Sequence, residues 1–196
     1  MTISYRNSSV LEEQVKAKFK QADMQQEYAR AMLVRSQALE LAAQYGLDKK
    51  QVSEAALLHN ISRLIPETDY LTLAEEYGAE ILPEERKNPH LLHQKISRIL
   101  AVEEFNISDK EVLNAISCHT TLRPSATLLD KIIFLASKQY TGKSIKFSLN
   151  TKQKPLAEKD LNASVLSCLF NEINNNQTTT CIHPWAQKAL EDLKKK

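Results

Sequence analysis

The sequence is poor in the residues that interrupt regular structure. Its 196 residues include only 3 glycines and 6 prolines, whereas a fold built from many short strands needs these residues at its turns. No β-branched run shows a clear alternation of apolar and polar residues, and no internal repeat is visible. This scarcity argues against a turn-rich all-β fold.

Cysteine is scarce as well. Cys118, Cys168 and Cys181 are an odd number without paired spacing, which does not fit a framework of disulfide bonds. The first residues lack the apolar segment of a signal peptide, and no apolar run approaches the roughly 18 residues of a membrane span. We therefore expect a reduced, cytoplasmic protein that does not contact a membrane.

The chain also lacks an excess of charge of one sign. It has 26 Lys and Arg against 24 Asp and Glu, a formal net charge of +2, which is too small to favour nucleic acid as a partner. Hydrophobic residues make up 42% and charged residues 26%, as in ordinary globular proteins. The length suits one core, so we expect a single domain over residues 1–196, with its core at about 10–193.

What the sequence does have is apolar spacing typical of helices. Capping signals at Ser9, Asp48 and Ser108, and stops at Gly46 and Gly78, divide it into segments. The expected helices span about residues 10–19, 25–45, 48–63, 69–77, 89–104, 108–118, 127–139, 160–174 and 184–195, with loops at 142–155 and 174–180. The sequence therefore predicts an all-α bundle of about eight or nine helices.

The histidines carry the most chemistry. They are His59, His90, His93, His119 and His183. Taken singly, each has a structural interpretation as a hydrogen-bonded core residue, a helix end or a turn. Taken together, His59, His93 and His119 lie at the ends of three expected helices, so they can converge on one cleft. Imidazole suits divalent transition metals, yet a hydrolytic metal centre also uses carboxylates, and Asn60 follows His59.

The residues around His59 read AALLHNISR (Ala55–Arg63), which resembles the ALLHD-x-x-K signature of the HD superfamily. Further similar segments are residues 38–48, 91–107, 111–124, 128–137 and 182–193. Their order and spacing are similar to those of one bacterial branch, the symmetrical diadenosine tetraphosphate hydrolases. The resemblance covers most of residues 10–193. It implies an all-α HD domain whose relatives are metal-dependent phosphohydrolases.

The resemblance also implies which residues form the site. In the family, histidines and two aspartates hold two metal ions, and the metals activate a water that attacks the polyphosphate. His59, His93 and His119 match three ligand positions. Three other ligand positions carry Arg30, Asn60 and Ser137 in this chain, so both metal-binding aspartates are missing. Further matches to the family motifs are Arg63, Thr120, Thr121, Arg123, Asp130 and Lys131.

The charge at these positions disfavours metal. A guanidinium at Arg30 within about 5 Å of a divalent ion repels it by several kcal/mol at an effective dielectric near 20. Asn60 supplies only a weak amide ligand. We therefore expect no tightly bound metal cofactor; if a metal does bind, divalent iron, manganese or zinc fits imidazole.

Three functions remain open from the sequence. The first is a degenerate, catalytically inactive HD domain that binds a nucleotide or dinucleoside polyphosphate in a metal-free basic pocket. That pocket would use Arg30, Arg63, Thr120, Thr121, Arg123 and Lys131. A pocket closed by pairing of Arg30 with Glu27 or Asp130 is the contrary expectation. The second function is an active dinucleoside tetraphosphatase that depends on Asp130. The third is a structural or interaction domain, for instance a homodimer.

Overall fold

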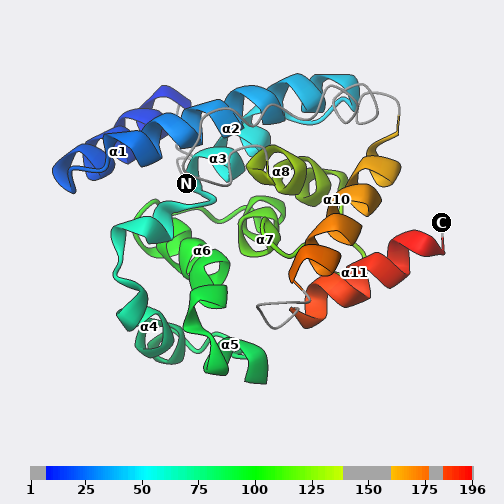
Figure 1. Ribbon diagram of the computed structural model, residues 1–196. Helices are drawn as coiled ribbons and strands as arrows, with labels where there is room; N and C mark the ends of the chain where they lie inside the picture. Colours follow the sequence, from blue (N-terminus) through cyan, green and yellow to red (C-terminus); the bar gives the residue numbers. More distant parts are fainter. Residues whose placement is uncertain (1–7, 139–159, 177–182, 196) are drawn as a thin grey trace.

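The fold of the chain is helical (Figure 1). A computed structural model describes residues 8–138, 160–176 and 183–195. Within these ranges it contains ten α-helices and three short 3-10 helices, and no strand. The α-helices are α1 (Ser8–Gln21), α2 (Gln25–Gln44), α3 (Lys49–Leu58), α4 (Tyr70–Glu76), α5 (Pro83–Lys87), α6 (His93–Glu103), α7 (Lys110–Cys118), α8 (Leu128–Lys138), α10 (Leu161–Asn176) and α11 (Pro184–Lys194). The prediction of an all-α fold is confirmed.

The helices surround a buried centre formed by α3, α7 and α8. Figure 1 shows α1 and α2 side by side along one edge, with α3 and α8 beneath them. α6 packs against α7, and α10 packs against both α8 and α11. Every residue from Leu129 to Ser137 in α8 is buried, as is expected of a helix enclosed on all sides. α8 therefore lies at the centre of the fold, and its neighbours pack around it.

The helix boundaries confirm some capping signals and correct others. Gly46 and Gly78 end their helices with positive φ, at 66° and 63°, and Asp48 accepts a hydrogen bond from the N–H of Lys50. The predicted cap at Ser108 is wrong, because Asp109 accepts from the N–H groups of Glu111 and Val112. The structure also places Ser9 inside α1, which begins at Ser8.

The third helix is shorter than the sequence predicts. It ends at Leu58, and a 3-10 helix at Ile61–Leu64 follows. Tertiary hydrogen bonds take over here: the N–H of Ser62 donates to the hydroxyl of Ser97, and Tyr70 donates to the carbonyl of Ser62. These bonds satisfy backbone groups that a continuing helix would have paired. The break leaves His59 directly after the last residue of α3.

Three further expectations concern the loops, the cysteines and the membrane. The expected loop at 142–155 and Cys181 lie outside the described residues, whereas residues 174–176 belong to α10. Cys118 and Cys168 are free thiols. No helix in the described ranges is long and apolar enough to cross a membrane.

The cap of α7 gives a direct test of this local structure. Replacing Asp109→Ala removes the acceptor for two N–H groups and for the amide of Gln51 at 2.8 Å. We expect a loss of about 1 to 2 kcal/mol in the free energy of unfolding, measured by urea denaturation. Ser108→Ala is the matched control and should change it little. An equal loss in both variants would contradict the assigned cap.

Candidate functional site

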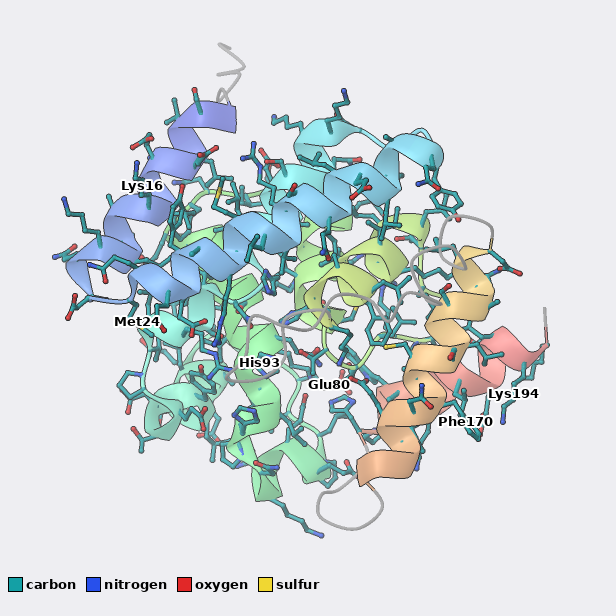
Figure 2. All side chains as sticks on the ribbon, turned by 45° about the horizontal axis from the view of Figure 1, so that its top comes forward. Lys16, Met24, Glu80, His93, Phe170 and Lys194 are labelled. Atoms are coloured by element: carbon teal, nitrogen blue, oxygen red, sulfur yellow. The ribbon has the colours of Figure 1, made fainter. Side chains whose placement is uncertain are left out.

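Three histidines from three helices meet in the interior of the fold. The ring centroids of His59 and His119 lie 5.0 Å apart, and those of His93 and His119 lie 5.1 Å apart, in edge-to-face arrangements. All three side chains are buried, and Figure 2 shows His93 on α6. We call His59, His93 and His119 the imidazole cluster.

Each imidazole is fixed by the same local hydrogen bond. His59 and His119 follow the last residues of α3 and α7, and His93 begins α6. In each case Nδ1 lies 2.7 to 3.0 Å from the carbonyl oxygen three residues earlier. Because a carbonyl only accepts, Nδ1 carries the proton in the neutral ring. The remaining nitrogen, Nε2, is therefore a hydrogen-bond acceptor in all three rings.

Burial keeps the cluster neutral. It lowers the pKa of His59 to about 4 and that of His93 to about 3. It also lowers the pKa of His119 well below the ordinary value, with further lowering from the neighbouring His59 and His93. Arg63 and Lys138 act in the same direction on members of the cluster. The imidazoles are therefore uncharged at neutral pH.

Two hydroxyl groups form hydrogen bonds at the cluster. The Thr120 hydroxyl lies 2.7 Å from Nε2 of His93 and donates to it. The Ser137 hydroxyl lies 3.0 Å from the carbonyl oxygen of His119 and 2.8 Å from that of Phe134, so it is bonded to backbone. Asn60 is half-buried beside His59. None of these neighbours brings negative charge.

Two cations, Arg63 and Lys138, act electrostatically on the cluster. The side chain of Arg63 is 41% exposed and lies 3.9 Å from Glu67. Lys138 donates to the carbonyl of Thr120 at 2.6 Å and pairs with Glu172 at 2.5 Å. Sequence reasoning missed Lys138, although it directly follows Ser137 at the carboxyl end of a helix, where a cation is favoured.

The residues present do not fit a two-metal centre. His, Cys, Asp and Glu in the described ranges form no group that could hold a metal ion. Nε2 of His93 accepts a hydrogen bond from Thr120, and the neighbouring Asn60 and Ser137 are neutral. Metal chemistry therefore has no set of anionic ligands here on which to depend.

Arg30 and Thr121 have partners of their own. Arg30 lies 3.1 Å from Glu27, one helical turn earlier, which is one of the two pairings considered from the sequence. Thr121 is buried and accepts a hydrogen bond at 3.0 Å from the amide of Gln94, whose oxygen also accepts from the N–H of Thr120. Gln94 thus holds the segment that carries Thr120 against α6.

Arg123, Asp130 and Lys131 have partners of their own in the structure. Arg123 donates to Asp130 at 2.9 Å, and Asp130 is fully buried and also accepts from the N–H of Thr127. Lys131 donates to Asn162 at 2.8 Å. Arg123 and Lys131 line a small hollow beside α11, and Asp130 lies two helical turns, roughly 10 Å, before Ser137. The partners seen for these residues are outside the imidazole cluster.

Burial of the cluster predicts a dependence of stability on pH. Below pH 6.5 the unfolded chain protonates its histidines, whereas folded His59 and His93 stay neutral down to about 4 and 3. The unfolded state therefore binds more protons in this range, so the free energy of unfolding falls as the pH drops from 6.5 toward 4. Above pH 6.5 the contribution of the neutral rings to stability is fully present. The upper bound is about 1.4 kcal/mol per pH unit for each imidazole.

Urea denaturation at several pH values checks this expectation. His59→Gln removes one titrating ring and should give a shallower fall than the unchanged protein. The exposed His90, which lies 2.9 Å from Glu67, is the control, because His90→Gln leaves the buried rings in place. Equal slopes for the unchanged protein and His59→Gln would contradict neutral burial.

Comparisons with known proteins agree on the family. The protein-family model named HD domain matches residues 28–140. The symmetrical bis(5'-nucleosyl)-tetraphosphatase of Bacillus subtilis is 31% identical over 161 residues, covering 81% of this chain and 84% of that one. The same-named protein of Halalkalibacterium halodurans is 34% identical over 155 residues, covering 74% and 76%.

A solved structure gives the same result. It is that of a predicted HD superfamily hydrolase involved in NAD metabolism from Clostridium acetobutylicum. It is 28% identical, has a TM-score of 0.85, and the match covers 93% of this chain and 96% of that chain. Together with the helical fold and the imidazole cluster, these matches identify the chain as a member of the HD domain family, related to the symmetrical bis(5'-nucleosyl)-tetraphosphatases.

Proposed function

We propose that this chain binds a dinucleoside polyphosphate or a related nucleotide at the imidazole cluster and does not hydrolyse it. The observation that carries the proposal is the charge around the cluster. Three neutral imidazoles are flanked by the cations Arg63 and Lys138, while Asn60 and Ser137 occupy the positions of the missing aspartates. A polyphosphate anion is the ligand that this balance of charge favours.

The flanking residues suggest how such a ligand would be held. A partly exposed guanidinium at Arg63 can donate two parallel hydrogen bonds to phosphate oxygens. Lys138 adds a point charge near Thr120. The Nε2 atoms of His59 and His119 are acceptors and suit ribose hydroxyl groups or water. The names of the related enzymes, bis(5'-nucleosyl)-tetraphosphatases, support dinucleoside tetraphosphate as the first ligand to test.

Loss of hydrolysis follows from the same residues. Attack on a phosphoryl group needs an activated water and a way to neutralise the developing charge. No carboxylate of the described residues belongs to the imidazole cluster, and Glu67 and Glu172 are paired with Arg63 and Lys138. Asp130, the residue on which activity would otherwise depend, is engaged by Arg123. The bound ligand would therefore stay intact.

One observation favours the second candidate, an active metal-dependent hydrolase. The Nδ1–carbonyl bonds leave Nε2 of His59 and His119 ready to act as ligands, the arrangement usual for metal-bound histidines. Metal analysis of untagged protein, expressed with iron, manganese and zinc supplied, separates the two candidates. A full equivalent of metal together with turnover would favour the enzyme and overturn the proposal.

Binding without turnover is the direct prediction. Calorimetry with diadenosine tetraphosphate in the presence of a chelator should give saturable binding, and chromatography should recover the ligand unchanged. Arg63→Gln should weaken binding about tenfold, because a charge-assisted contact to phosphate is lost. Arg86→Gln is the matched control, since Arg86 of α5 pairs with Glu75 of α4. Absence of binding at millimolar ligand would overturn the proposal.

Restoring the missing ligands provides the complementary test. The triple variant Arg30→His, Asn60→Asp, Ser137→Asp returns the ligand types of the related family. We expect it to bind divalent metal stoichiometrically, while the unchanged protein binds little, and to cleave diadenosine tetraphosphate. Arg30→His alone is the control, because it restores no carboxylate. Equal metal content in the unchanged protein and the triple variant would contradict the charge argument.

A further inference from the structure

A second hollow lies away from the imidazole cluster and shares no residue with it. It opens between the loop after α4, two turns of α6, α7 and the start of α11. The residues around it are Tyr77, Gly78, Ala79, Glu80, Lys95, Arg98, Ile99, Asn114, Ser117 and Trp185. Its volume is about 340 Å³, at the lower end of the range of small-molecule pockets.

Trp185, the single tryptophan of the chain, forms an aromatic wall of this hollow. The ammonium of Lys95 lies 5.0 Å from the centroid of its ring. The ring of His183 packs edge-on against it, with centroids 5.6 Å apart and planes at 76°. His183 also accepts a hydrogen bond from the N–H of Trp185. The indole is therefore held in a defined orientation.

A buried carboxylate fixes the residues behind this wall. Glu85 is fully buried and accepts from Lys95 at 2.7 Å and from His183 at 3.1 Å. Burial acts to raise the pKa of Glu85, but these hydrogen bonds outweigh it and hold the pKa below its ordinary value. Lys95 donates in addition to the carbonyl of Glu80 at 2.7 Å. Desolvating such a pair is costly, so its gain lies in positioning Lys95 and Trp185.

The rim of the hollow carries unused polar groups. Arg98 is exposed and has no ion-pair partner in the described ranges. Tyr77 is 46% exposed, and Asn114 is half-buried on α7. The exposed Glu80, labelled in Figure 2, also borders the opening. The rim thus offers a guanidinium for an anion, and a carboxylate and an amide for amino groups.

We propose that this hollow binds a mononucleotide, with the base against Trp185 and the phosphate on Arg98. A flat heterocycle stacks on indole, and this stacking accepts any base. Glu80 and Asn114 can pair with the exocyclic amino group of adenine, and the guanidinium of Arg98 matches phosphate. This site does not depend on the imidazole cluster, so it stands or falls separately from the function proposed there.

The single tryptophan makes the test direct. Intrinsic fluorescence, excited at the red edge of the tryptophan band where adenine does not absorb, is followed during titration with AMP. We expect saturable quenching with AMP, weaker binding of adenosine, and no change with inorganic phosphate alone. Absence of saturable quenching at millimolar AMP would overturn the proposal. Equal affinity for adenosine and AMP would also overturn it, because Arg98 would then contribute nothing.

Three variants locate the effect. Arg98→Gln should raise the dissociation constant for AMP about tenfold, whereas the matched Arg86→Gln, outside the hollow, should not. Arg63→Gln should leave the titration of Trp185 unchanged while it weakens diadenosine tetraphosphate binding, so failure at one site is distinguishable from failure at the other. Quenching that is unaffected by Arg98→Gln, or that is lost in Arg63→Gln, would refute a separate site.

Discussion

Three helices begin or end at one buried point, each with an imidazole bonded to its own backbone, and the interior of the fold depends on this arrangement. The hydrogen bonds from Nδ1 of His59, His93 and His119 to carbonyl groups three residues earlier orient the rings without any outside partner. Because these rings are uncharged, they can be buried without a counter-ion. The ends of α3, α6 and α7 can therefore meet around uncharged rings.

The neighbours of the imidazole cluster are neutral hydroxyl and amide groups together with two cations. Asn60, half-buried beside His59, and the buried Ser137 are both neutral. Hydroxyl groups join the segments here: Thr120 donates a hydrogen bond to His93, and Ser137 donates one to the backbone carbonyl of His119. The cations Arg63 and Lys138 act electrostatically on the cluster, and they are paired with Glu67 and Glu172.

A second buried network joins segments that are far apart in the sequence. Glu85, Lys95 and His183 connect α5, α6 and the start of α11. Its cost in desolvation is large compared with the gain expected from a buried ion pair, which makes specificity of arrangement the better explanation. The network fixes the position of Trp185 beside a hollow. The residues that line this hollow do not include the imidazole cluster.

The sequence by itself determined the helices and the family. Apolar spacing, the glycine stops at Gly46 and Gly78 and the cap at Asp48 depend on local backbone preferences, which act over a few residues and can be read directly. The segments around His59, His93 and His119 likewise identified the HD domain before any contact was known.

Only the tertiary structure decided where the charged side chains act. Arg123 and Asp130 come from matching motifs, but they pair with each other. No motif in the sequence assigned Lys138 to the site, yet its charge lowers the pKa values of His93 and His119. The end of α3 beside His59 depends on Ser97 and Tyr70, which are distant from the break along the chain. Long side chains choose partners through packing across helices, and local sequence does not encode that choice because the competing partners come from other segments.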